Sequence, residues 1–287
     1  MNAPEGTSKF VPKQALAPTP QLYDELVGDS MEQLAKASLA QISPIPFGSV
    51  IHDNGCGTGA GTAAVVEAIA ASKAEVSIKG TDINEKALEV YRKHAAENKW
   101  PAEAEQMDSL KLSIADNTFT LTIGNAFLFV LPNDGIDAVK EMYRTLKPGG
   151  KMLVNSWAYV PNMEPLQTAA KATRPPGTPL PREGMAKWAP ADFVQNVVEK
   201  GGFEKDKIVM KKAEVYCTTT ELTHFATMLW SFIGGTSEVG WLESDEANWD
   251  KAINVVKEEL AKTDGYKAID GGRAQLKFVA NIAIATK

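Results

Sequence analysis

The sequence predicts an α/β fold in which a largely parallel sheet carries helices on both faces. Strand-like and helix-like segments alternate between residues 49 and 157, and a glycine-rich turn joins the first strand to a helix. An acidic residue also ends each of the first two strands. With 287 residues, of which 44% are hydrophobic, the chain can bury a substantial core.

Apolar spacing and turn signals predict the elements in order. The predicted strands are 50–53, 75–82, 104–107, 118–124, 151–157, 207–218 and 275–286, and the predicted helices are 23–42, 61–71, 84–98, 134–146, 191–199, 221–232 and 246–262. Seven prolines between Pro161 and Pro190 predict irregular structure there. We expect one domain over 1–287, divided into an arm (1–20), an N-terminal helix (21–45), a core (46–157), covering elements (158–245) and a final helix and strand (246–287).

The bulk composition excludes several classes of protein. A net charge of −6 without blocks of like charge gives no attraction to nucleic acid or to an anionic membrane. Two cysteines cannot form a disulfide framework, and no apolar run is long enough to cross a bilayer. The polar, proline-bearing first twenty residues have no apolar signal core. We therefore expect a cytoplasmic protein.

The segment from Ser49 to Gly61 describes a strand, a glycine turn and the start of a helix. Such a turn brings backbone N–H groups and the positive end of a helix dipole close to a ligand. Asp53 at the end of the strand favours a ligand that carries an ammonium group. The rival interpretation is a dinucleotide site, because Gly55, Gly57 and Ala60 satisfy G-x-G-x-x-A and Asp82 ends the next strand.

Four motifs in this order resemble those of the class I S-adenosylmethionine-dependent methyltransferases. They are Ile51-His52-Asp53-Asn54-Gly55-Cys56-Gly57-Thr58-Gly59, Gly80-Thr81-Asp82-Ile83-Asn84, Met107-Asp108-Ser109-Leu110 and Leu146-Lys147-Pro148-Gly149-Gly150. The segments from Tyr23 to Gly28 and from Asn155 to Trp157 resemble the small-molecule subgroup that includes ubiquinone-biosynthesis enzymes and gliotoxin-type S-methyltransferases. The resemblance implies a Rossmann-like, seven-stranded sheet whose last strand is antiparallel.

The resemblance also implies the residues of the site. S-adenosylmethionine, which leaves as S-adenosylhomocysteine, would be held by Tyr23, Gly28, Asp53, Gly55, Cys56, Gly57, Gly59, Asp82, Ile83, Met107, Asp108, Ser109 and Asn125. Within this set Asp82 would accept the ribose hydroxyls and Asp108 the adenine amino group. The acceptor would lie against aromatic residues from variable segments, namely Phe127, Phe129, Trp157, Tyr159 and Trp230.

Each assignment has a structural alternative. Asp82 could cap the helix near Asn84, Asp108 could be a loop acid, and Asn125 could be a turn residue. Tyr23 and Trp230 could serve in packing. Cys56 is interpreted as a small packing residue in spite of its place in the turn.

Of the three histidines, His52 is interpreted as packing and His94 as surface. His224 is the candidate for a catalytic base or acceptor contact, with an ordinary helix histidine as the alternative. No histidine–carboxylate cluster has metal-ligand spacing, so we expect no metal. Residues 125–128 lack the Asn/Asp-Pro-Pro-aromatic run typical of nucleic-acid amino-methylating enzymes.

The resulting hypothesis is methyl transfer to a small molecule, such as a secondary metabolite, at a thiol, hydroxyl or amine. The alternatives are an NAD-dependent oxidoreductase on the same strand–turn–helix unit and a cofactor-binding protein without methyl-transfer activity. The acceptor and the oligomeric state are not encoded in any of these patterns.

Overall fold

Strand β1 (Ser49–Asn54) lies inside the sheet, and five of its six residues are buried. Such continuous burial is typical of parallel strands that are covered on both faces. In this computed structural model, which describes residues 10–70 and 72–287, β1 pairs in parallel with β2 (Val76–Asp82) and β4 (Phe119–Gly124). Ile51 consequently lies between Ile78 and Leu121.

The sheet has the order β3-β2-β1-β4-β5-β8-β6. The remaining strands are β3 (Ala102–Gln106), β5 (Leu146–Tyr159), β6 (Ile208–Thr218), β7 (Lys267–Ile269) and β8 (Arg273–Thr286). Backbone hydrogen bonds join Gly149 and Gly150 near the start of β5 to Lys287 after the end of β8, so these two strands are antiparallel. The predicted fold class is confirmed, and the short β7, which pairs antiparallel with β8, is an addition that the sequence did not predict.

The chain divides into two compact units, and each combines separate segments. The sheet unit contains residues 31–158, 187–215 and 279–287, and the helical unit contains the described residues up to Ser30 together with 159–186 and 216–278. The division expected from the sequence runs along the chain, and the assignment of all 287 residues to one domain stays a prediction.

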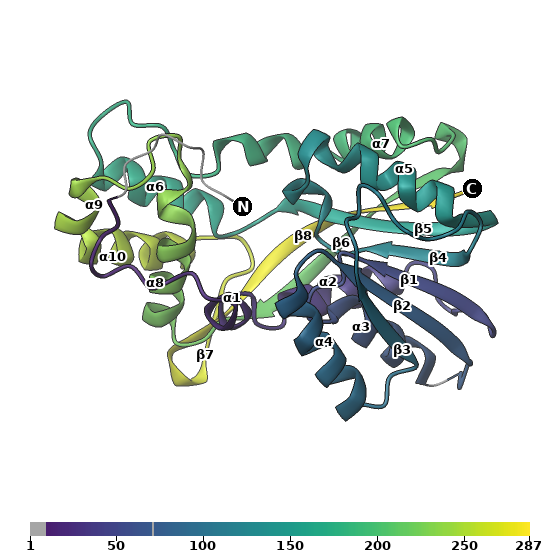
Figure 1. Cartoon of the computed structure of the whole chain (residues 1–287). Helices are drawn as coiled ribbons and strands as arrows, with labels where there is room; N and C mark the ends of the chain where they lie inside the picture. Colours follow the sequence, from purple (N-terminus) through teal and green to yellow (C-terminus); the bar gives the residue numbers. More distant parts are fainter. Residues whose placement is uncertain (1–9, 71) are drawn as a thin grey trace. The chain divides into compact units, whose positions relative to one another are not determined.

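Helices cover both faces of the sheet unit (Figure 1). They are α2 (Ser30–Leu39), α3 (Ala60–Ala70), α4 (Glu85–Glu97), α5 (Ile136–Thr145) and α7 (Ala191–Lys200). Figure 1 shows α5 and α7 above the sheet and α3 and α4 below it. Helix α4 begins as predicted, because the Asn84 side chain accepts a hydrogen bond from the N–H of Lys86.

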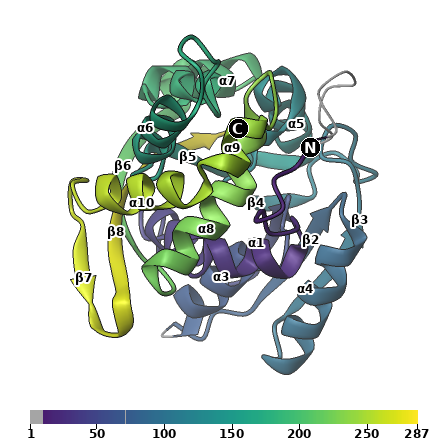
Figure 2. The ribbon, with the colours of Figure 1, turned by 90° about the vertical axis from the view of Figure 1, so that its left-hand side faces the viewer.

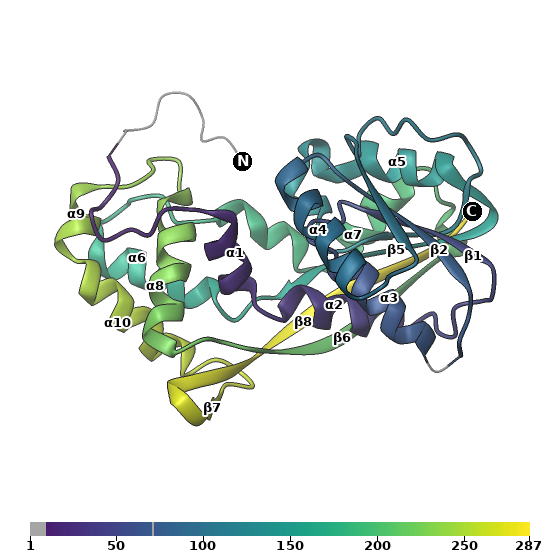
Figure 3. The same ribbon diagram turned by 60° about the horizontal axis from the view of Figure 1, so that its bottom comes forward.

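The helical unit contains α1 (Pro20–Val27), α6 (Met163–Thr173), α8 (Leu222–Ile233), α9 (Glu243–Ala247) and α10 (Trp249–Leu260). Helix α10 packs against α6 and α8, as Figure 2 shows, and α1 lies beside α8 (Figure 3). Within residues 10–70 and 72–287, every helix is too short or too polar to span a membrane.

Three local predictions are wrong. The single helix expected over 21–45 is two helices, because α1 ends at Gly28 and α2 begins at Ser30. The helix expected over 246–262 is likewise divided, at Asn248. The proline-rich segment contains α6, since Pro165 lies in the first turn of that helix, where backbone N–H groups have no intrahelical partner.

Candidate functional site

The glycine turn after β1 is bonded to the end of β2. The N–H of Gly55 donates to the carbonyl of Thr81 (2.8 Å), and the N–H of Gly57 donates to Oδ2 of Asp82 (2.9 Å). Oδ1 of Asp82 accepts the N–H of Asn84 (2.8 Å). A carboxylate oxygen can accept two hydrogen bonds, so each oxygen of Asp82 keeps the capacity to accept one more donor.

The three glycines of the turn have different surroundings. A Cβ on Gly55 would lie 2.7 Å from the Phe127 ring, and a Cβ on Gly59 would lie 2.7 Å from the Trp100 ring. A Cβ on Gly57 would meet no atom within 4 Å. Gly57, with a φ of +52°, is therefore the position at which the turn is open for the close approach of a ligand.

Asp53 is the buried acid of the site. Its Oδ2 accepts the hydroxyl of Thr62 (2.8 Å), whereas Oδ1 has no hydrogen-bond partner among the described residues. Burial raises the pKa of Asp53 to about 6, although the hydrogen bonds from the Thr62 side chain and backbone lower it. The carboxylate thus combines a structural contact to α3 with one oxygen to which no described residue donates.

Tyr91 of α4 contacts Thr62, the hydrogen-bond partner of Asp53. Its hydroxyl lies 2.8 Å from Oγ1 of Thr62, and its ring meets Trp100 edge to face, with the centroids 5.8 Å apart. Cys56 is buried in the same apolar cluster, and burial raises the pKa of its thiol far above the usual range. Cys56 therefore packs as a neutral thiol, in agreement with the packing interpretation.

Two histidines hold elements in place. His52 is fully buried between the hydroxyls of Thr81 (2.9 Å) and Thr122 (3.4 Å), and burial lowers its pKa to about 3. His94 is half-buried, and its Nδ1 lies 3.0 Å from the carbonyl of Thr58 in the glycine turn. His94 thus contacts the turn directly, a role that the sequence did not predict.

An exposed apolar residue, Ile83, follows the end of β2, and a second carboxylate, Asp108, lies just beyond the end of β3. Ile83 is 67% exposed, while Met107 is buried and its N–H donates to the carbonyl of Asp82 (3.0 Å). The carboxylate of Asp108 is exposed and accepts the N–H of Leu110 (2.9 Å), as in an Asx turn. Asp108 therefore begins a structural turn just beyond the end of β3.

Asn54 connects this edge to Asp53. Its Oδ1 accepts the hydroxyl of Ser109 (2.8 Å), whereas its buried Nδ2 has no partner within the described part of the chain. Reasoning from the sequence missed Asn54. The position of Asn54 between Asp53 and Gly55 is the feature of the sequence that could have identified it.

Asn125 belongs to a network that secures α2. Its Nδ2 donates to the carbonyl of Met31 (3.0 Å), and its Oδ1 accepts Nδ2 of Asn155 (2.8 Å). Asn155, which was not among the expected site residues, also donates to the hydroxyl of Ser38 (2.9 Å) and accepts the N–H of Ala126 (2.7 Å). The side chain of Asn125 is thus engaged in structural contacts.

The aromatic residues expected to contact an acceptor occupy different environments. Phe127 is buried against Gly55 and Gly124, which makes its ring part of the core. Phe129 is half-buried and meets the Trp188 ring edge to face, with the centroids 6.0 Å apart. Trp157 is also half-buried.

In the helical unit, Trp230 is fully buried and packs against Arg174, Trp241 and Gly234. Its position matches the alternative that assigns this residue to packing. Tyr159 is half-buried, and its pKa is raised by burial.

Tyr23, Gly28 and His224 also belong to the helical unit. Half of the Tyr23 side chain is exposed, and its ring lies edge to face on Phe232. His224 is exposed in the first turn of α8, and its Nε2 lies 2.8 Å from Oε1 of Glu25. The roles expected for these three residues stay predictions.

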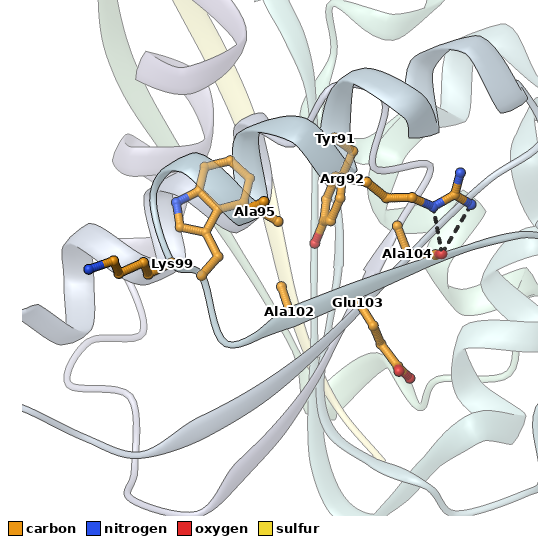
Figure 4. A pocket seen from close by; sticks show the side chains of 9 residues that line it. Tyr91, Arg92, Ala95, Lys99, Ala102, Glu103 and Ala104 are labelled. Atoms are coloured by element: carbon orange, nitrogen blue, oxygen red, sulfur yellow. Dashed lines mark hydrogen bonds between the residues drawn. The ribbon is translucent and has the colours of Figure 1, made fainter.

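A surface pocket between α4 and β3 contains none of the expected site residues (Figure 4). Tyr91, Arg92 and Trp100 contribute to its lining. Nε and Nη2 of Arg92 both donate to the carbonyl of Ala104, which covers an otherwise free acceptor on the edge strand β3. This pocket is therefore separate from the residues at the strand ends.

Comparison with known proteins finds a family model that matches part of the sheet unit. Residues 51–150 match the family described as methyltransferase domain. The chain is 26% identical over 270 residues to methyltransferase ktnA of Aspergillus niger, a match that covers 83% of this chain and 84% of that protein. It is 40% identical over 141 residues to a demethylmenaquinone methyltransferase of Staphylococcus epidermidis, covering 46% of this chain and 54% of that protein. The chain thus spans about half the length of the second relative.

Solved structures share the fold. The YcgJ protein from Bacillus subtilis superposes with a TM-score of 0.55 at 15% identity, covering 88% of this chain and 97% of that one. Phosphoethanolamine N-methyltransferase 2 of Haemonchus contortus, in complex with S-adenosyl-L-methionine, gives a TM-score of 0.51 at 17% identity. That match covers 93% of this chain and 56% of the other.

Proposed function

We propose that this chain, which carries an S-adenosylmethionine-dependent methyltransferase domain over residues 51–150, methylates a small molecule. The family expected from the sequence and its cofactor agree with the domain match. The proposal has three parts. The acceptor is a small molecule, the protein serves secondary metabolism, and the methyl group is transferred to a thiol, a hydroxyl or an amine. A demethylmenaquinone acceptor appears in the name of one relative, and we extend only the small-molecule class to this chain.

One observation carries the cofactor assignment. Among the residues that the structure describes, no donor reaches Oδ1 of Asp53, a buried carboxylate oxygen, and the turn that follows Asp53 is open at Gly57. A buried acceptor without a partner costs free energy, and an ammonium group that donates to it removes this cost. The methionine end of S-adenosylmethionine carries such a group, whereas the pyrophosphate of a dinucleotide would bring a second negative charge.

The remaining assignments follow the strand ends. We assign Asp82, with its two free acceptor positions, to the ribose hydroxyls, and the exposed Ile83 to a face of the adenine ring. Asp108 and Ser109 are assigned to the adenine edge. Asn125 is assigned through its backbone carbonyl, because its side chain is already bonded.

The cofactor supplies a methyl group bound to a sulfonium, and the sulfur is a good leaving group because it departs as a neutral thioether. The chain then has to hold the acceptor in line and exclude water, so orientation provides much of the rate. A thiolate or free amine needs no base, whereas a hydroxyl benefits from one. His224 stays the candidate base, and its contact with Glu25 would orient the imidazole.

Calorimetric titration with S-adenosylhomocysteine and, separately, with NADH tests the cofactor assignment. We expect micromolar affinity for the first and no heat with the second. Binding of NADH alone would overturn the proposal and support the oxidoreductase alternative. Methyl transfer is then tested with radiolabelled S-adenosylmethionine and separate pools of thiols, phenols and amines. Cofactor binding without label transfer to any pool would favour the non-methylating alternative.

A further inference from the structure

Asn54 joins segments of the sheet unit that are far apart in the sequence. It is the last residue of β1, directly before Gly55, and its side chain is fully buried. Oδ1 of Asn54 accepts the hydroxyl of Ser109, which lies beyond the end of β3, over 2.8 Å. The hydroxyl of Thr81, the residue paired with Asn54 on β2, donates to the same oxygen over a longer distance of 3.4 Å. Two hydroxyl donors from outside β1 thus determine the orientation of the amide.

Ser109 is the buried member of a tight turn. The N–H of Lys111 donates to the carbonyl of Asp108 (3.0 Å), and the N–H of Leu110 donates to Oδ1 of Asp108 (2.9 Å). Asp108 is exposed, whereas Ser109 is buried. Because these two hydrogen bonds define the shape of the turn, the bond from Ser109 to Asn54 sets the position of the Asp108 carboxylate relative to the glycine turn.

A chain of polar groups continues from Asn54 into the sheet. Nε2 of His52 lies 2.9 Å from the hydroxyl oxygen of Thr81, and Nδ1 of His52 lies 3.4 Å from that of Thr122. A hydroxyl carries one proton, so Thr81 donates to Asn54 only when His52 donates to Thr81 from Nε2. The side chains of this chain are fully buried. Since buried hydrogen-bond networks hold their members in one arrangement, the oxygen of Asn54 is already in place for Ser109.

Stability does not account for an asparagine at this position. Nδ2 of Asn54 is buried and has no hydrogen-bond partner among residues 10–70 and 72–287. A buried donor without a partner costs free energy, and an apolar side chain of similar size, such as leucine, would carry no such donor. The purpose of Asn54 therefore lies in what its oxygen holds, namely the turn that begins at Asp108.

We propose that Asn54 is a positioning residue that gives the cofactor site its specificity for adenine. The inference rests on the proposed function, in which the glycine turn holds the methionine part of the cofactor and Asp108 accepts the adenine amino group. One cofactor molecule makes both contacts only when the glycine turn and the carboxylate are correctly spaced, and the bond from Ser109 to Asn54 sets this spacing. A carboxylate in that position accepts from the amino group of adenine and repels the carbonyl oxygen that replaces it in hypoxanthine.

The test compares two affinities, measured by calorimetry on the full chain. The ligands are S-adenosylhomocysteine and S-inosylhomocysteine, in which a carbonyl replaces the adenine amino group. We expect the wild type to prefer the adenine compound by about tenfold or more. In N54L and in S109A, each of which removes one partner of the bond, this preference should fall to about threefold or less. S109T, which keeps the hydroxyl, should retain most of the preference. S109A tests the same bond through a smaller change than N54L, should N54L not fold.

S49A is the matched control. Ser49 is the first residue of β1, it is buried, and its hydroxyl donates to the carbonyl of Pro46 (2.7 Å). The variant thus removes one buried hydroxyl at the opposite end of the same strand, and it should keep the wild-type preference.

The ratio of the two affinities separates positioning from a structural role. A residue that only stabilises the fold would weaken the binding of both compounds by the same factor. An unchanged preference in N54L and S109A would therefore overturn the inference, and so would a wild type that binds both compounds equally, although S-adenosylhomocysteine binding would still support the proposed function. A folded wild type that binds neither compound would instead contradict the proposed function, and the inference with it.

Discussion

Oδ2 of Asp53 accepts a 2.8 Å hydrogen bond from the Thr62 hydroxyl, while Oδ1 of the same carboxylate has no partner in the described residues. Burial raises the pKa of this group from 3.8 to about 6. The Asp53 carboxyl therefore ionises at a lower pH in the unfolded chain than in the folded chain. As a result, the free energy of unfolding falls as the pH rises from about 4 to 6. The cost above pH 6 is at most about 3 kcal/mol, since one pKa unit is worth about 1.4 kcal/mol.

Asp53→Asn removes this cost together with the charge. We expect the variant to be more stable than the wild type by about 1–2 kcal/mol at pH 8 and equal to it near pH 4. Urea unfolding at pH 4, 5, 6 and 8 measures the difference, in which the titration of other groups such as His52 cancels. The exposed Asp206→Asn serves as the control and should show no such pH dependence. A stability difference that does not change with pH would contradict the prediction.

Gly57→Ala and Gly48→Ala form a matched pair. Both glycines have positive φ (+52° and +76°), and a Cβ on either meets no atom within 4 Å. Each alanine should therefore cost about 1 kcal/mol of stability through its backbone conformation alone. Only the Cβ at position 57 enters the space assigned to the cofactor, so calorimetry should show a loss of S-adenosylhomocysteine affinity of about tenfold or more in G57A and none in G48A. An equal affinity in the two variants would mean that the turn is not the binding surface.

Asp82→Ala tests the assignment of the ribose. The substitution removes the acceptor of the Gly57 and Asn84 N–H groups as well as both positions assigned to the hydroxyls. We expect S-adenosylhomocysteine affinity to fall by about a hundredfold or more while the cooperative unfolding transition is retained. Asp206→Ala controls for the loss of one negative charge. A folded Asp82→Ala variant with wild-type affinity would refute the assignment of the cofactor to this edge.

The strand ends of the site were predictable because their signals are local. Asp53, Gly57 and Asp82 lie within short motifs whose spacing places them at the same edge of a parallel sheet. Helix α4 was similarly predictable from the cap at Asn84. By contrast, the sequence does not predict α6, because a cluster of prolines favours irregular structure, although a proline in the first turn is compatible with a helix.

The acceptor side was less predictable because burial depends on contacts distant in sequence. Trp230 and Phe127 were expected to be available to a ligand, yet the structure buries both against residues of other segments. An aromatic residue has the same apolar signal in a core and in a pocket.

Arg174 and Asp245 form a buried ion pair that connects the end of α6 to α9. Nε and Nη2 of Arg174 donate to the two carboxylate oxygens (2.8 and 2.9 Å), and both side chains are almost fully buried. The guanidinium also lies 5.8 Å from the ring centroid of Trp230 and 6.0 Å from that of Trp241. Arg174→Met leaves Asp245 charged and unpaired in the core, so we expect a loss of about 3–5 kcal/mol in the free energy of unfolding.

The double variant Arg174→Met, Asp245→Leu distinguishes a missing counter-ion from missing packing. Because it removes both charges, it should recover most of the stability that Arg174→Met loses, as for other buried pairs replaced by apolar residues. Urea unfolding of the wild type, both single variants and the double variant gives the coupling energy. Lys171→Met, an exposed change on the same helix, should stay within about 0.5 kcal/mol of the wild type. If the double variant were as unstable as Arg174→Met, the hydrogen bonds of Arg174 to Ser237 and Gly234, and not its pairing with Asp245, would hold this part of the helical unit together.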